Sequence, residues 1–144
     1  MIDIKKIEGM ARDVRELFES VLASSLGTRE TQGSCLYASI LLKELMSKFL
    51  GVQATVRGGG GGMDGGFGDV QGLVRGHYWT EVACPESGQR WVVDVTADQF
   101  GEERVRVLAI EEAVQYTPGS QNVVDGHVED EMNQISLIAK MKDK

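Results

Sequence analysis

The sequence predicts an α+β domain in which N-terminal helices pack on a small antiparallel sheet. Two observations lead to this prediction: the first third of the chain repeats apolar residues at helical spacing, and the middle holds short runs of aromatic and β-branched residues separated by turn residues. A third observation is the length, because 144 residues are enough for one hydrophobic core and no repeat or linker divides them. We therefore expect residues 1–144 to form a single domain.

Two helices are expected in the N-terminal third. From residue 4 to residue 22, apolar side chains recur at steps of three and four, which places them on one helical face. A second and more apolar helix is expected over residues 35–49. Ser34 is its expected N-cap, and Gly51 is the residue expected to end it.

Strands are expected to follow these helices. Residues 52–57 alternate apolar and polar side chains, as a half-buried strand does. Residues 78–82 and 91–95 are rich in aromatic and β-branched side chains, and residues 85–89 between them have turn chemistry, so the two runs are predicted to form a hairpin. A further short strand is expected over residues 104–107.

Glycine dominates residues 58–76, with five glycines in a row at 58–62. Because glycine weakens both helices and strands, the segment is predicted to be a mobile loop. The loop ends directly at His77, so it is interpreted either as a lid over a neighbouring site or as a hairpin tip. It lacks the Gly-Lys-Ser/Thr ending of a phosphate-binding loop, which argues against a nucleotide role.

Helical pieces are expected to complete the chain. Residues 110–115 are predicted to form a short helix, and apolar residues at steps of three from Met132 to Met141 predict a final one. The acidic run over residues 125–131, which contains His127, is interpreted as a solvated segment that leads into the final helix.

Composition narrows the class of partner. The net charge of -7 supplies no basic field, so neither nucleic acid nor an anionic membrane is expected as the main partner. A polypeptide or small amide substrate is expected, and a small cationic or neutral polypeptide suits the charge better. Charges interrupt the apolar N-terminal residues, and no stretch is long enough to span a membrane. With two cysteines in different surroundings, a reduced, cytoplasmic protein is expected. No cofactor is expected, nor a metal, since the C-x-x-C and H-E-x-x-H motifs are missing.

Cys35 is the first residue of the second predicted helix. Its sulfur would lie beside unpaired backbone N–H groups and the positive end of the helix dipole. Such a position favours the thiolate, which is the reactive form of cysteine. Cys35 is therefore the candidate nucleophile, and a buried core cysteine is the alternative.

His77 and Asp94 belong to the two strands of the predicted hairpin. Asp94 lies in an otherwise apolar strand, where an unpaired carboxylate is costly to bury, so it needs a partner. His77 on the neighbouring strand is the candidate partner. The carboxylate would then accept from one ring nitrogen while the other nitrogen faces the sulfur of Cys35, which makes His77 the base and Asp94 the group that orients it.

The order of these motifs resembles that of transglutaminase-like proteins. Gly-Ser-Cys35 before an apolar helix, His77-Tyr-Trp-Thr-Glu-Val and Trp-Val-Val-Asp94-Val-Thr together look like the family's Cys, His-x-Trp-x-Glu and Asp-x-Thr pattern. The similarity covers about half the chain, residues 33–100. The resemblance implies a papain-like core with the cysteine on a central helix and a Cys-His-Asp triad that transfers acyl groups through a thioester.

The same resemblance suggests further site residues. By analogy with papain-like enzymes, the side chain of Gln32 and the backbone N–H of Cys35 would stabilise an oxyanion, although the spacing is shorter than in papain and a surface amide is the alternative. Trp79 and Glu81 are candidates for substrate binding; a core aromatic residue and a solvated strand residue are the respective alternatives.

Three functions remain open at this point. The first is a thiol hydrolase of the peptidase or amidase kind, which acts on a peptide or side-chain amide bond. The second is acyl transfer to an amine or deamidation of glutamine by the same triad. The third is a binding module that keeps the fold and has no catalytic activity.

Overall fold

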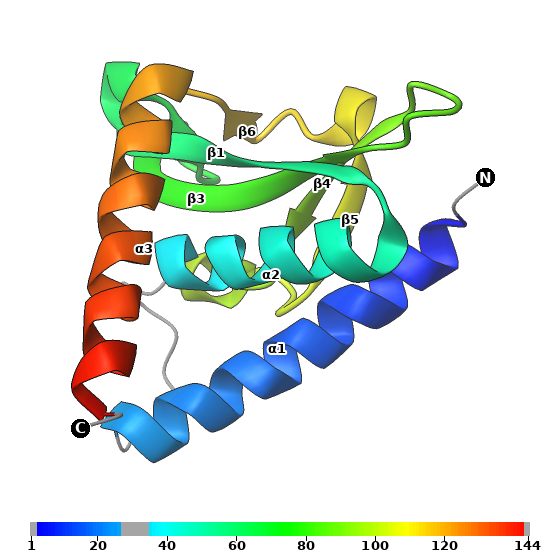
Figure 1. Ribbon diagram of the computed structural model, residues 1–144. Coiled ribbons are helices and arrows are strands. Elements are labelled where there is room, and N and C mark those ends of the chain that lie inside the picture. Colours follow the sequence, from blue (N-terminus) through cyan, green and yellow to red (C-terminus); the bar gives the residue numbers. More distant parts are fainter. Residues whose placement is uncertain (1–2, 27–34, 143–144) are drawn as a thin grey trace.

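A computed structural model describes residues 3–26 and 35–142 of the chain, with the side chains of residues 25–26 and 135–142 left aside. Within these residues, three α-helices accompany a six-stranded antiparallel sheet, in agreement with the predicted α+β class. Figure 1 shows α1 (Ile4–Leu26) and α2 (Cys35–Leu50) stacked on one side of the sheet, with α3 (Gln121–Lys142) standing across its end. The two helices precede the strands along the chain, as the sequence indicates.

Both predicted N-terminal helices are present, with small changes at their ends. The first extends four residues beyond the predicted end, to Leu26, and the second begins at Cys35 and ends one residue late, at Leu50. Gly51 follows with a φ of 64°, a left-handed conformation that glycine adopts without strain. The predicted N-cap, Ser34, lies outside the described residues.

The sheet is built around one long strand, β3 (Val74–Ala83). β1 (Gln53–Gly61) pairs with β3 along one edge, while β4 (Arg90–Asp94) and the short β2 (Gly66–Gly68) pair with the other edge. β5 (Arg106–Ala109) continues the sheet beyond β4, and β6 (Tyr116–Thr117) beyond β2. The hairpin predicted from residues 78–95 is therefore confirmed as β3 and β4, with Thr80 opposite Val93.

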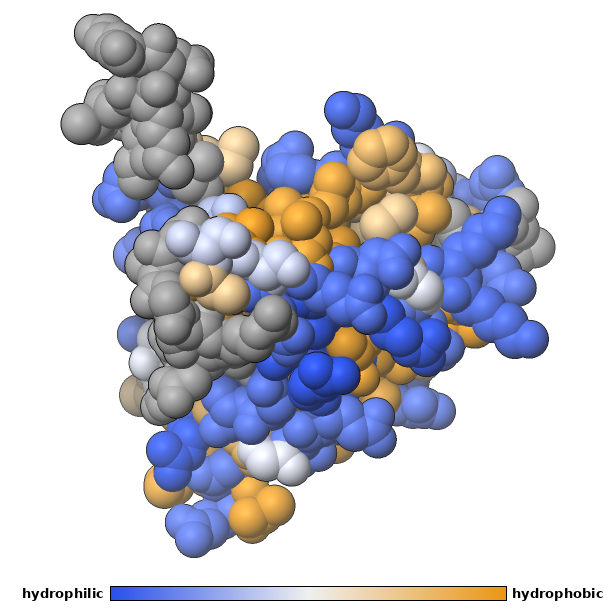
Figure 2. Space-filling model, turned by 90° about the horizontal axis from the view of Figure 1, so that it is seen from below, coloured by the Kyte–Doolittle hydropathy of each residue, from blue (hydrophilic) through white to orange (hydrophobic). Residues whose placement is uncertain are grey.

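The main core lies between the two stacked helices and the sheet. Apolar side chains of α1 and α2 pack there against the inward side chains of β3 and β4; this set includes Ile7, Val14, Phe18, Leu42, Met46, Val82 and Val93. A second cluster, on a different part of the sheet, contains Phe67, Trp79, Val92 and Tyr116. Seen from below, where α1 lies in front, the surface is largely hydrophilic with an apolar band beside it (Figure 2), as expected for an amphipathic helix packed on a core.

The glycine-rich segment contradicts the prediction of a mobile loop over residues 58–76. Gly58–Gly61 continue β1 and pair with β3, Gly59 standing opposite His77. Only two short connections lie between the strands of this segment, a 3-10 turn at Gly62–Asp64 with Gly65 after it, and an irregular turn over residues 69–73. The physical reason is close backbone packing. A Cβ atom on Gly58, where φ is 140°, would overlap the carbonyl oxygen of His77, and one on Gly59 would overlap the carbonyl oxygen of Asp64. Glycine at these two positions allows neighbouring backbone segments to approach closely, and there is no room for a side chain at either position.

This packing predicts that substitution of two adjacent glycines destabilises the fold to very different extents. Gly59→Ala is expected to lower the free energy of unfolding by about 3 kcal/mol or more, because the new Cβ meets backbone that cannot move aside. Gly60→Ala is the matched control: its Cβ would find Asp64 Oδ2 at 3.7 Å, an ordinary contact, and the change should stay within about 0.5 kcal/mol. Urea unfolding measures both values. Similar values for the two variants would contradict the packing account.

Three predictions in the C-terminal third need correction. The strand predicted over residues 104–107 is β5, which starts two residues later at Arg106. The helix predicted over residues 110–115 is a single 3-10 turn, Ile110–Glu112, because Ala113 and Tyr116 turn inward and join the second core cluster. The acidic run over residues 125–131 lies inside α3, which already begins at Gln121, because Val124 packs against Ile40 and Val56 and holds the helix on β1 and α2.

No helix in the described part of the chain is long and apolar enough to cross a lipid bilayer.

Candidate active site

Cys35 occupies the first position of α2 and is a half-buried residue that forms no disulfide. Two hydrogen bonds, one within α2 and one from β3, fix this end of the helix. The Ser39 hydroxyl donates to the Cys35 carbonyl at 2.7 Å, and the buried Thr80 hydroxyl of β3 donates to the Ser39 carbonyl at 2.8 Å. The start of α2 is thereby tied to the strand that carries His77.

His77 lies on β3 with no exposed surface. Its Nε2 is 2.7 Å from Asp94 Oδ2, and the Cys35 thiol is within hydrogen-bonding reach of the same ring. Since Asp94 occupies Nε2, Nδ1 is the nitrogen that remains for the sulfur. The structure therefore brings Cys35, His77 and Asp94 together in the order that the sequence predicts.

Asp94 is the last residue of β4, and 1% of its surface is exposed. All its neighbours are donors: the Thr96 backbone N–H reaches Oδ1 at 2.9 Å, and the Tyr116 hydroxyl reaches Oδ2 at 2.8 Å, beside the contact with His77. Burial alone would raise the pKa of Asp94, but the charge of His77 and these hydrogen bonds outweigh burial and lower it. Asp94 is thus held as a buried carboxylate.

The carboxylate determines the protonation of His77. Burial alone would lower the pKa of His77, but the attraction and hydrogen bond of Asp94, with a smaller effect from Cys35, raise it to about 9. At neutral pH the imidazole therefore carries a proton on each nitrogen. One proton points to Asp94, and the other is available to a group on the Cys35 side.

This arrangement predicts an unusual titration. The NMR signals of the His77 ring are expected to move with a midpoint near pH 9, and Asp94→Asn should shift the midpoint down by two units or more, because it removes the main charge that favours the proton. A His127→Gln variant assigns the signal. A midpoint near 6.5 in the unmodified protein would contradict the buried ion pair.

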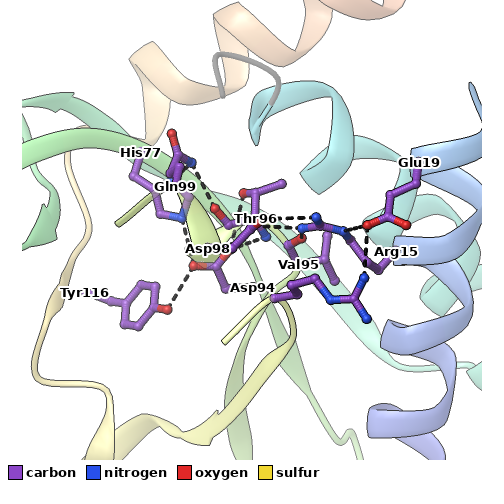
Figure 3. A network of polar contacts seen from close by, with 10 residues as sticks. Arg15, Glu19, His77, Asp94, Val95, Thr96, Asp98, Gln99 and Tyr116 are labelled. Carbon is purple, nitrogen blue, oxygen red and sulfur yellow. Dashed lines mark hydrogen bonds and ion pairs between the residues drawn. The ribbon is translucent and has the colours of Figure 1, made fainter. Parts of the chain in front are cut away.

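An arginine from α1 fixes the loop that follows Asp94. Arg15 is 4% exposed; its guanidinium donates to the Val95 carbonyl at 2.6 Å and to both carboxylate oxygens of Asp98 at 2.8 and 3.0 Å. Its Nε donates to Glu19 at 2.9 Å. Figure 3 shows how these contacts continue through the loop to Thr96 and Asp94. Helix α1 therefore helps to hold the carboxylate in place.

Tyr116 supports Asp94 from the opposite side. The ring is buried against Trp79 and Phe67, and the hydroxyl points to Asp94 Oδ2. Burial first and the neighbouring carboxylate second raise the pKa of Tyr116, so the phenol keeps its proton and donates it. Arg106 Nη1 in turn donates to the Tyr116 hydroxyl at 3.3 Å.

Gln99 contacts the other nitrogen of the imidazole. Its amide nitrogen is 3.1 Å from His77 Nδ1 and 3.1 Å from the Thr96 carbonyl oxygen. The Thr96 carbonyl can accept only from the amino group of the Gln99 side chain, so this bond determines that the amino group, and not the oxygen, faces His77. The Gln99 amino group can therefore donate to Nδ1 only when the imidazole is neutral, because a protonated Nδ1 has no lone pair with which to accept.

Sequence reasoning missed Arg15, Tyr116 and Gln99. Gln99 lies at the end of the motif region, and its glutamine side chain carries no signal that separates it from a surface amide. Tyr116 and Arg15 reach Asp94 and its loop from residues 22 positions later and about 80 positions earlier, respectively, and a single sequence does not reveal such long-range contacts.

The remaining predicted site residues have different surroundings. Trp79 is 2% exposed, and its ring centroid is 6.2 Å from that of His77, so it forms part of the wall behind the imidazole. Glu81 accepts from Arg90 at 2.7 Å across the β3–β4 hairpin, and no contact joins it to Cys35, His77 or Asp94 within the described residues. Gln32 lies outside the described residues.

No group of three or more His, Cys, Asp or Glu side chains among the described residues is placed to hold a metal ion. No protein-family model, no curated protein and no solved structure matches the chain. The chemistry of the site must therefore be inferred from its own residues.

Proposed function

We propose that the protein is a cysteine-dependent hydrolase that cleaves an amide bond, in a peptide or a small amide, through a thioester intermediate. The observation that carries this proposal is the His77 ring, held between the buried carboxylate of Asp94 and the thiol of Cys35. Three further donors, the Thr96 backbone N–H, the Thr96 hydroxyl and the Tyr116 hydroxyl, hold the Asp94 carboxylate in place. Such precise positioning of the carboxylate is what a catalytic His-Asp pair requires. The same helix-and-sheet arrangement supports a papain-like or transglutaminase-like core.

In the first half of the reaction, Cys35 would attack as the thiolate, its proton being held by His77. The sulfur forms a bond to the amide carbon, and the electron pair of the carbonyl bond moves to the oxygen. When this intermediate collapses, the C–N bond breaks, the leaving nitrogen takes the proton from His77, and a thioester on Cys35 remains. The backbone N–H of Cys35 and the side chain of Gln32 are the proposed donors to the oxyanion.

In the second half, water replaces the amine. Neutral His77 takes a proton from the water as its oxygen attacks the thioester carbon, and collapse breaks the C–S bond. The carboxylic acid leaves, and the thiolate and protonated imidazole are restored. Throughout the cycle Asp94 keeps its charge and stabilises the imidazolium. Neither cysteine forms a disulfide, which is compatible with the reducing cytoplasm, the compartment in which we propose that the enzyme acts.

The test is product analysis by mass spectrometry after incubation with a peptide library and with small amides. Hydrolysis gives two fragments that together contain one added water, whereas deamidation raises the mass by about one dalton and transfer to an amine joins two molecules. We expect fragments from the unmodified protein. Cys35→Ala should form none. In the unmodified protein, a thioester on Cys35 should be trapped at short times.

Cys84→Ala is the matched control, because it removes the second thiol, which is buried in the main core away from His77. Its product pattern should equal that of the unmodified protein. If neither protein forms any product, the site serves recognition only. If Cys35→Ala keeps the activity, hydrolysis does not use Cys35. Either result would mean that the proposal of a cysteine-dependent hydrolase is wrong.

A further inference from the structure

A cleft with a volume of about 430 Å³ opens beside the candidate site. It is lined by Asp69, Val70, Gln71, Arg75, Gln99 and Phe100. Its size is within the range of small-ligand sites, roughly 300–1,000 Å³. Two segments form its walls, the turn between β2 and β3 and the loop that follows Asp94.

Two of the lining residues touch the imidazole directly. Gln99 Nε2 is 3.1 Å from His77 Nδ1, and the Phe100 ring meets the His77 ring edge to face with centroids 4.9 Å apart. Arg75 is two positions before His77 on β3, so the two side chains project from the same face about 7 Å apart along the strand. The cleft therefore adjoins the His77 imidazole, with Gln99 and Phe100 between the two.

Arg75 presents its positive charge to the solvent side of this cleft. Its Nε donates to Asp69 Oδ2 at 2.8 Å, and neither Nη nitrogen is bonded to any of the described residues. The Arg75 side chain is 56% exposed, while that of Asp69 is only 14% exposed. In this ion pair, the guanidinium of Arg75 therefore faces the solvent and the carboxylate of Asp69 faces the protein.

Asp69 also fixes the position of this arginine. Its Oδ1 accepts from the backbone N–H groups of Gln71 and Leu73 at 2.9 and 3.0 Å, while Oδ2 holds Arg75. With three donors around it, the carboxylate of Asp69 is satisfied within its own turn. The free edge of the guanidinium is left as a planar pair of donors, the geometry that suits a carboxylate.

The position of His77 decides which part of a substrate this cleft would receive. In amide cleavage, the imidazolium gives its proton to the leaving nitrogen, so the leaving amine must lie against the His77 ring. Gln99 and Phe100 line the cleft and contact that ring, so the cleft lies on the side of the leaving amine.

We propose that this cleft, here termed the Arg75 cleft, binds the amine component of the substrate amide and selects an amine that bears a carboxylate, which accepts from the two Nη groups of Arg75. The inference rests on the proposed hydrolase function, since it names the half of the amide that the cleft receives. Two sources share this chemistry, the C-terminal carboxylate of a peptide and the side chain of an acidic residue.

Binding of product amines tests the proposal, and the Cys35→Ser variant is used so that the amide bonds of the probes are not turned over. The probes are the dipeptide Gly-Ala, its C-terminal amide and the C-terminal amide of Gly-Glu, titrated into ¹⁵N-labelled full-length protein. We expect the dissociation constant of at least one carboxylate-bearing probe to be about tenfold lower than that of Gly-Ala amide. Signals of the Arg75 Nε–H and the Gln99 side-chain amide should move. Preference for Gly-Ala indicates a C-terminal carboxylate, and preference for Gly-Glu amide an acidic side chain.

Substitutions identify the cation responsible. Arg75→Gln should remove the tenfold preference and leave the binding of Gly-Ala amide unchanged, while Arg75→Lys, which keeps the charge without the paired donors, should retain only part of it. Arg90→Gln is the matched control, because Arg90 is a similarly exposed arginine paired with Glu81 on the hairpin. Equal affinities for all three probes, no binding at tens of millimolar, or a preference that survives in Arg75→Gln would overturn the proposal.

The result does not depend on whether the protein hydrolyses anything. The probes contain amide bonds, so the titrations are made in the Cys35→Ser variant, which lacks the thiol that would form the thioester. Carboxylate selection through Arg75 without hydrolysis of any library substrate would leave the site in place and refute the hydrolase. Hydrolysis of a library substrate without any preference for a carboxylate would support the hydrolase and refute the carboxylate site at Arg75.

Discussion

Asp94→Asn is expected to lower kcat/KM for amide hydrolysis by roughly 10³-fold to 10⁴-fold. The reason lies in the donors around the carboxylate. The Thr96 backbone N–H points at Oδ1 and cannot turn away, so the oxygen of an asparagine must take that position and its amino group must face His77. His77 Nε2 then has to accept, which places the ring proton on Nδ1 and removes the lone pair that serves Cys35.

Tyr116→Phe is the matched control for this substitution. It removes another hydrogen bond to the same carboxylate, at 2.8 Å, but it keeps the charge and the contact with His77, so kcat/KM should fall by about tenfold or less. Steady-state kinetics on a substrate from the library, with circular dichroism to verify folding, measure both effects. An asparagine variant that retains more than about a tenth of the activity would contradict the proposed role of Asp94.

Arg15→Ala is expected to lower the free energy of unfolding by about 3 kcal/mol. The guanidinium is almost fully buried and serves the Val95 carbonyl, Asp98 and Glu19 at once, so truncation leaves several polar groups without their donor. Because the loop it holds carries Thr96 and Gln99, the variant should also lose part of the alignment of Asp94 and His77. Urea unfolding measures the loss of stability.

Arg12→Ala is the control that distinguishes the loss of the buried Arg15 network from the loss of a positive charge on α1. Arg12 is 66% exposed and lies 3.8 Å from Glu8 one turn away, an interaction that contributes at most about 0.5 kcal/mol. The two variants should therefore differ by more than about 2 kcal/mol. Equal stabilities would mean that the Arg15 network does not support the fold.

The parts of the fold that the sequence predicts well are those in which local pattern and packing agree. The two N-terminal helices repeat apolar residues at a spacing that the core uses directly, so their limits are within a few residues of the prediction. The β3–β4 hairpin was predictable because turn residues separate two β-branched runs. Asp94 was a useful signal because a carboxylate within an apolar strand requires a partner, and His77 provides it at 2.7 Å.

The errors arise where tertiary contacts override local preference. The glycines at 58–61 have low strand propensity, yet they continue β1 because only backbone without side chains fits against His77 and Asp64. The start of α3 at Gln121 is likewise set by Val124 packing on Ile40 and Val56, although the acidic run around it is polar. Arg15, Tyr116 and Gln99 join the site through the folded arrangement alone.

The most direct test of the triad is the rate at which iodoacetamide modifies Cys35 in the folded protein at neutral pH, followed by peptide mass analysis with Cys84 as internal reference. Cys35 lies close enough to His77 to help raise the pKa of its imidazole, whereas Cys84 is 3% exposed in the main core. We predict that Cys35 reacts about 100-fold faster than Cys84, and that His77→Ala or Asp94→Asn removes most of this difference. Equally slow modification of both thiols, or a Cys35 rate that neither substitution changes, would contradict the account of Cys35, His77 and Asp94 as one nucleophilic unit.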